Sequence, residues 1–169
     1  GISSRALFDL EAADEVFQHE GLSAYRAYQR EHEQDLLEPG TAYPLVKGLL
    51  RVNERADERL VEVIIFSRND ADTGMRVLRS VEAHGLDIMR GVFRGGRDPW
   101  PLLQPMHCAV FLSAESSQVL KAREHGVASA LILPSALPTD EDLDEVRIAF
   151  DGDAVLFDAE SQLLYDSEG

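Results

Sequence analysis

The chain alternates short apolar runs with segments of mixed polarity. One nearly continuous β-branched run covers residues 61–66, and further apolar runs cover residues 108–112, 127–133 and 146–150. Runs of this length are typical of strands that are buried on both faces. Helix-like segments separate the first three runs, and this alternation of strand and helix predicts an α/β fold built on a parallel sheet.

Helix signals mark the segments between these runs. Met75, Leu78 and Val81 recur at helical spacing, and Gly85 follows them as a predicted left-handed C-terminal cap. Residues 116–125 form a second helix-like segment. We therefore expect a three-layer domain, with helices on both faces of the sheet.

The front of the chain differs from this pattern. Residues 11–35 are acidic and aromatic, with apolar positions at mixed three- and four-residue spacings and Gly21 between two predicted short helices. We expect residues 11–40 to form a small helical cap that closes over a ligand site. The apolar segment within residues 1–9 is too short to be expected as a central strand.

Composition narrows the classes of partner. The 169 residues carry 16 Lys and Arg against 31 Asp and Glu, a formal net charge of -15. This charge repels nucleic acids and anionic bilayers, and the apolar runs are shorter than the roughly 20 residues that cross a bilayer, so we expect neither partner. Cys108 is the only cysteine, which excludes an intrachain disulfide and fits the cytoplasmic location that we expect.

Polar residues follow each predicted strand, where ligands collect in parallel α/β folds. The four strand ends read Ser67-Arg-Asn-Asp70, Ser113-Ala-Glu115, Pro134-Ser135 and Asp151-Gly-Asp153. In the last of them, two carboxylates one residue apart can converge on a single Mg²⁺, and the glycine lets the backbone approach a ligand.

The last strand end also resembles a known family. Residues 147–157 read Arg-Ile-Ala-Phe-Asp-Gly-Asp-Ala-Val-Leu-Phe and match the Asp-x-Asp-x-(Thr or Val) signature of the haloacid dehalogenase-like phosphatases. More specifically, Ala149 to Phe157 resembles the cytosolic type I 5'-nucleotidases. Further segments that resemble this family are Ser3–Asp9, Glu20–Tyr25, Tyr28–Glu31 and Glu38–Gly40, so the resemblance covers essentially the whole chain.

The resemblance implies a Rossmann-like fold and the Mg²⁺-dependent hydrolysis of nucleoside 5'-monophosphates to nucleoside and phosphate. Asp151 would be the nucleophile that becomes an aspartyl phosphate, and Asp153 the acid and base of the two steps. Ser67 and Asn69 would bind the phosphate. Asp151, Asp153 and Glu115 would hold Mg²⁺.

These residues also have purely structural interpretations. Asp151 and Asp153 can belong to a solvated turn, since Asp and Gly are common turn residues. Ser67, Asn69 or Asp70 can cap the helix that follows the first long strand. The pattern alone does not separate these alternatives.

A faint internal repeat bears on which part of the chain carries the chemistry. The segment Ser3–Asp9 aligns with Gly152–Asp158, which places Ser4 opposite Asp153. Ile2 stands opposite Asp151, so the first copy has neither acid. If the family consists of two phosphatase-like halves, residues 1–145 form the degenerate half and residues 146–169 begin the competent one.

Three hypotheses follow from these observations. The chain is a 5'-nucleotidase or part of one. Alternatively, it is a non-catalytic pseudo-phosphatase half that supports or regulates a catalytic half, and packs against that half or a second copy of itself. In a third arrangement, Asp151, Ser67 and Glu115 meet at adjacent strand ends in one active site.

Overall fold

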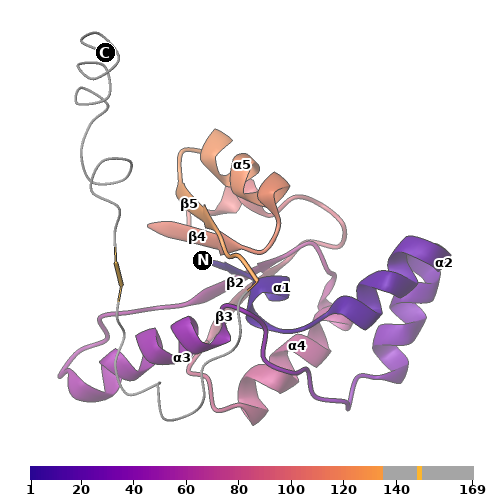
Figure 1. The fold of residues 1–169 in the computed structure, drawn as a ribbon, viewed down its shortest axis with the longest axis horizontal. Coiled ribbons are helices and arrows are strands. Elements are labelled where there is room, and N and C mark those ends of the chain that lie inside the picture. The colour runs from indigo at the N-terminus through magenta and orange to yellow at the C-terminus, as the bar shows by residue number, and fades with distance from the viewer. Residues whose placement is uncertain (135–147, 150–169) are drawn as a thin grey trace, which may run out of the picture.

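The computed structural model describes residues 1–134 and 148–149, and within them the chain forms one parallel sheet with flanking helices (Figure 1). The strand order is β3-β2-β1-β4-β5, and every neighbouring pair is parallel. The strands are β1 (Ile2–Ser3), β2 (Ile64–Ser67), β3 (Arg90–Phe93), β4 (Val110–Ser113) and β5 (Ala128–Leu131). The predicted α/β fold with a parallel sheet is confirmed.

The first strand corrects one expectation, because β1 is the central strand of the sheet. Ile2 pairs with Ile65 of β2 on one side and with Leu112 of β4 on the other. Two neighbours satisfy the backbone of a strand only two residues long, and the Ile2 side chain is 1% exposed. Because β1 is paired with a strand on each edge, it can be much shorter than a strand that has no such neighbours.

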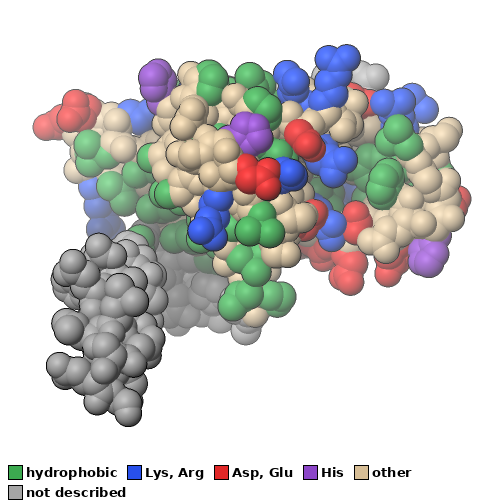
Figure 2. All heavy atoms as spheres, turned by 90° about the horizontal axis from the view of Figure 1, so that it is seen from above, with side chains coloured by type: hydrophobic (Ala, Val, Ile, Leu, Met, Phe, Trp, Pro, Cys, Tyr) green, Lys and Arg blue, Asp and Glu red, His purple; other side chains and the backbone are tan. Residues whose placement is uncertain are grey.

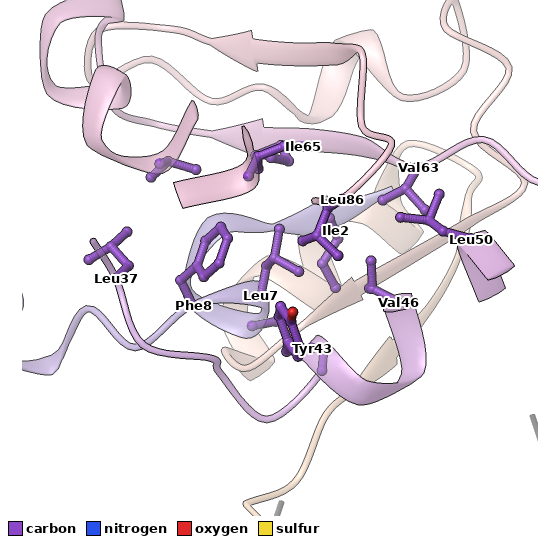
Figure 3. Close-up of a cluster of buried hydrophobic side chains, with 14 of the residues drawn as sticks. Ile2, Leu7, Phe8, Leu37, Tyr43, Val46, Leu50, Val63, Ile65 and Leu86 are labelled. Carbon is purple, nitrogen blue, oxygen red and sulfur yellow. The ribbon is translucent and has the colours of Figure 1, made fainter. Parts of the chain in front are cut away.

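Alternate residues of the strands point into two separate cores, one on each face of the sheet. Ile65 packs with Ile2, with Tyr43 and Val46 of α3 (Tyr43–Arg51), and with α4 (Ala71–Ala83), as Figure 3 shows in close-up. Its neighbours Ile64 and Phe66 pack on the other face, with Phe111 and with α5 (Ser116–Glu124). This is the three-layer arrangement that the apolar runs predict.

Two glycines end or break helices as predicted. Gly85 has φ +64° just after α4, which is the left-handed conformation of a C-terminal cap. Gly21 has φ +83° inside α2 (Glu11–Glu31) and divides it into two helical pieces. Helix α2 therefore has the predicted break, and it packs beside α4 at one side of the molecule (Figure 1).

The remaining elements are short. They are α1 (Ser4–Leu7) directly after β1, and the 3₁₀ turns η1 (Val52–Arg55) and η2 (Trp100–Leu102). Strand β3 was not predicted, and the predicted strand at 146–150 lies largely outside the described residues, as does the predicted boundary at 145. No helix of the described part is long and apolar enough to cross a membrane.

Charged side chains of both signs lie close together on the face of the molecule in Figure 2. Exposed ion pairs of the described residues include Arg90 with Glu62 and Arg59 with Asp87. Such exposed pairs add little stability individually. The fold depends on its two apolar cores.

Candidate functional site

A cavity of about 530 Å³ lies at the carboxyl ends of β1, β2 and β4. Its lining comes from Ser3 and Ser4 after β1, from the loop after β2 and from Glu115 after β4, and helix α2 supplies the facing wall. Ligand pockets usually measure about 300–1,000 Å³ and lie at this edge of a parallel sheet. This cavity is therefore the candidate site of the described residues.

Serine hydroxyls form the floor of the cavity. Ser4 and Ser67 are 6% and 5% exposed, and their Oγ atoms lie 3.3 Å apart. Ser67 Oγ also accepts a hydrogen bond from the backbone N–H of Asn69, at 3.2 Å. Either hydroxyl can be the donor in the contact between Ser4 and Ser67.

Arg5, in α1 directly after β1, lies at the edge of this floor and reaches Glu115 after β4. Arg5 Nη1 donates to Glu115 Oε1 at 3.0 Å, and Arg5 Nη2 lies 3.1 Å from Asp14 Oδ2 of α2. The two carboxylates hold the guanidinium in place between the sheet and α2. Arg5 therefore links α2 to the end of β4 through its two ion pairs.

The donor set of the described cavity does not fit a divalent metal ion. Glu115, the predicted third ligand of Mg²⁺, is occupied by Arg5. Within residues 1–134 and 148–149, no group of three or more His, Cys, Asp or Glu side chains is arranged to hold a metal. A hard cation needs several oxygen ligands converging on one point, and here a guanidinium stands between the two nearest carboxylates.

Helix α2 is attached to the loop after β2 by polar contacts. Tyr25 donates from its hydroxyl to Asn69 Oδ1 at 2.9 Å and accepts from Gln29 Nε2 at the same distance. Arg26 Nη2 pairs with Asp70 Oδ2 at 3.0 Å. Burial raises the pKa of Tyr25, and its hydrogen bonds to Gln29 and Asn69 only partly oppose this shift.

The capping role belongs to Asp70. Its Oδ1 accepts from the backbone N–H of Thr73 at 2.9 Å and from the Thr73 hydroxyl at 2.8 Å, at the start of α4. The backbone hydrogen bond from Thr73 is the main reason that the pKa of Asp70 is lowered, and Arg26 adds to the effect. Ser67 and Asn69 are thereby left to face the cavity.

The comparisons with known proteins agree with this architecture. A family model described as 5'-nucleotidase matches residues 1–169. The chain belongs to the 5'-nucleotidase family. Human cytosolic 5'-nucleotidase 1B is 35% identical to it over 167 residues, which are 95% of this chain and 27% of that protein. The chain thus spans about a quarter of this relative, and no solved structure matches it.

In this 5'-nucleotidase family member, three predicted site residues line one cavity. Ser67 ends β2, Asn69 lies in the loop after it, and Glu115 follows β4; these two strands lie on either side of β1. Asp151 and Asp153 lie outside the described residues, so their predicted roles remain predictions.

Sequence reasoning missed Arg5 and the anchoring role of Tyr25. The sequence held one signal for the position of Arg5. The alignment of Ser4 with Asp153, which follows a predicted strand, places residues 3–5 of this 5'-nucleotidase family member at the end of a strand as well. Because this segment was expected to be too short for a central strand, the sequence analysis did not place Arg5 at a strand end. The partners of Arg5 follow only from the pairing of β1 with β4.

Proposed function

We propose that the chain is part of an enzyme that hydrolyses nucleoside 5'-monophosphates, with Asp151 and Asp153 as the catalytic residues. The observation that carries this proposal is the family match, which extends over the whole chain and includes Asp151-Gly-Asp153. The relative is named a cytosolic 5'-nucleotidase, and we propose the cytoplasm as the location of this protein too.

The reaction proceeds in two steps. A carboxylate oxygen of Asp151 attacks phosphorus, and the bond from phosphorus to the ribose 5'-oxygen breaks while Asp153 donates a proton to that oxygen. The nucleoside leaves. Asp153 then takes a proton from a water molecule whose oxygen attacks the aspartyl phosphate, which releases phosphate and restores both carboxyl groups.

We propose Mg²⁺ as the cofactor, held by Asp151 and Asp153. When bound, this ion offsets the negative charge of the phosphate in a strongly acidic protein. Glu115 is the third predicted ligand, and its Oε1 is paired with Arg5 at 3.0 Å, which leaves Oε2 as the oxygen that could join them.

Ser67 and Asn69 are the proposed phosphate-binding residues of the chain. Their support is that both line the cavity at the carboxyl edge of the sheet. Ser67 Oγ is buried and close to a second hydroxyl, and the Asn69 side chain is oriented by Tyr25. Phosphate oxygens accept hydrogen bonds from hydroxyl and amide donors of this kind.

The test is phosphate release from adenosine 5'-monophosphate or a pyrimidine nucleoside monophosphate with Mg²⁺, by this chain and by a longer polypeptide that extends past residue 169. Asp151→Asn should lower turnover by at least about 1,000-fold, since it removes the nucleophile. Asp158→Asn is the matched control and should retain turnover. Turnover that survives in Asp151→Asn, or that is absent from both polypeptides, would rule out the proposal.

A second candidate function is a non-catalytic half that supports or regulates a catalytic half. It is favoured by β1 and the residue after it, where Ile2 and Ser4 stand in place of the two acids. A 169-residue chain with no turnover that restores activity when mixed with the downstream portion would favour this candidate. Turnover by the 169-residue chain alone would exclude it.

A further inference from the structure

We infer that β5 is an interface between two copies of this chain, which join edge to edge and antiparallel around a two-fold axis. Strand β5 lies at one edge of the sheet, next to β4 and beside α5 (Figure 1). The interface uses none of the residues to which catalysis, phosphate binding or metal binding is assigned above.

The outer edge of β5 offers backbone hydrogen-bonding groups. The N–H of Ile132, just after β5, donates to Ser113 O of β4 at 2.8 Å, so the even-numbered residues turn their backbone groups toward β4. Because these groups alternate in direction along a strand, the N–H and C=O of Ser129 and Leu131 point away from the sheet. Within the described part of the chain, no strand pairs with them. A further strand can therefore add to this edge.

The two edges of the sheet differ in their side chains. The opposite edge strand, β3, carries Arg90, which is ion-paired with Glu62, and charged residues on an edge strand oppose pairing with another chain. Residues 126–134 carry no ionisable side chain. Ala130 is exposed and Leu131 is 40% exposed. Strand β5 is thus the edge without charges that prevent association.

Charge favours a second copy of this chain as the occupant. The formal net charge of -15 makes two copies repel each other over most of their surfaces. Residues 108–134, which include β4, α5 and β5, differ because they carry two basic and two acidic side chains, a formal net charge of zero: Lys121, Arg123, Glu115 and Glu124. Two acidic copies can approach most closely where each presents a neutral region.

The outer edge of β5 suits two-fold symmetry, in which both copies bury the same surface. In a pairing centred on Ala130, Ser129 of each copy lies opposite Leu131 of the other, and the outward backbone groups of both strands bond each other. The two α5 helices then lie on the same face of the joined sheet. Leu120 of α5 is 56% exposed and follows Val119, whose carbonyl accepts from Ser129 Oγ at 2.9 Å, so it adds apolar surface near the contact.

Sedimentation velocity of the 169-residue chain tests for this dimer. One strand pair and the side of one helix make a small interface, so we expect a Kd of about 1–100 μM. Added salt should strengthen association, because it screens the repulsion between two acidic chains. An interface that consists of surface ion pairs would weaken in salt, and that result would contradict the inference.

A matched pair of variants assigns the dimer to β5. Leu131→Lys should raise the dimer Kd by at least about tenfold, because it places a charge on the paired edge. Leu60→Lys makes the same change at a residue that is 60% exposed and precedes β2, and it should leave the Kd within about twofold. Thermal unfolding shows whether both variants are folded.

Cross-linking tests the pairing itself, independently of any loss of affinity. In the pairing centred on Ala130, this residue faces its own counterpart at a distance that suits a disulfide. Ala130→Cys should therefore form a covalent dimer under mild oxidation. Ala128→Cys is the control, because Ala128 is also exposed but lies opposite Ile132 in this pairing. The unchanged chain, which has only Cys108, gives the background.

Hydrogen exchange distinguishes a second copy from another segment of the same chain. The amide hydrogens of Ser129 and Leu131 should exchange rapidly in dilute solution, where the chain is monomeric, and slowly when it is concentrated. Protection that persists in the monomer would show that the chain covers this edge itself, and would overturn the inference. A chain that stays monomeric at about 200 μM, twice the weakest Kd expected for so small an interface, would also overturn it. Equal cross-linking of Ala128→Cys and Ala130→Cys, or an equal loss of association in Leu131→Lys and Leu60→Lys, would do the same.

Discussion

The floor and the cap of the cavity are held in place by different forces. The floor is the end of β1 and β2, where buried side chains such as Ile65 and Phe66 fix the strands between two apolar cores. The cap is α2, whose Phe17 is about half exposed and whose attachment to the loop after β2 is mainly polar. The comparison indicates a rigid binding floor and a cap that can loosen without unfolding the domain.

The largest expected effect contrasts one residue from each region. Ile65→Ala should lower the free energy of unfolding by about 2–5 kcal/mol, because Ile65 is fully buried in the central part of the sheet. Phe17→Ala should cost less than about 1 kcal/mol, since the ring is 47% exposed. Urea denaturation measures both. Equal losses would contradict the difference between floor and cap.

The next effect concerns Asp70, which lies where floor and cap meet. Asp70→Ala should cost about 0.5–2 kcal/mol of stability, because α4 loses its N-terminal cap. Asp70→Asn is the matched variant, since asparagine also caps helices, and it should cost less. Urea denaturation of both variants at pH 7 gives the comparison.

The same pair of variants predicts a pH dependence. The pKa of Asp70 is lower in the folded chain than in the unfolded one, so its charge stabilises the fold above its ordinary pKa. This contribution is lost as the pH falls through the lowered pKa. The stability difference between the unchanged chain and Asp70→Asn should therefore be full at pH 7 and shrink in strong acid. A difference that grows in acid would contradict this sign.

A smaller effect is expected at the attachment of α2. Tyr25→Phe removes the hydroxyl that bonds Asn69 and Gln29, and should cost about 0.5–1.5 kcal/mol. Hydrogen exchange should become faster in α2 and stay unchanged in β2. Equal acceleration in both elements would show that the cap and the floor unfold together.

The smallest effect is expected for the exposed ion pair of the cap. Arg26→Gln removes the pair with Asp70 at 3.0 Å and should cost about 0.2–1 kcal/mol at low salt. The difference from the unchanged chain should narrow as salt is added, because salt screens exposed charges. Denaturation at low and high ionic strength measures it, and a loss that salt leaves unchanged would contradict the assignment.

Most of the sheet could be predicted because its strands are apolar on both faces. The runs at 61–66, 108–112 and 127–133 overlap β2, β4 and β5. Strand β3 carries Gly91 and two exposed positions at the edge of the sheet, so it has no apolar run to recognise. In the helix after β2, Val81 is buried as its spacing suggests, while Met75 and Leu78 are each 38% exposed.

The site could be predicted only in part, for a physical reason. Ser67, Asn69 and Glu115 follow predicted strands, and the rule that strand ends meet at one edge brings them together. The ion pair of Arg5 with Glu115 joins residues 110 positions apart, through strands whose pairing the sequence pattern does not specify. Its consequence for metal binding becomes visible only in the folded chain.

The proposed role of Asp151 as the nucleophile can be tested by locating the transferred phosphoryl group. A polypeptide that extends past residue 169 would be mixed with adenosine 5'-monophosphate labelled in its phosphate, quenched in acid, digested and analysed by mass spectrometry. We predict label on the peptide that contains Asp151 and none on peptides that contain Ser4 or Ser67. Label on either serine, or an active enzyme that acquires none at Asp151, would contradict the account.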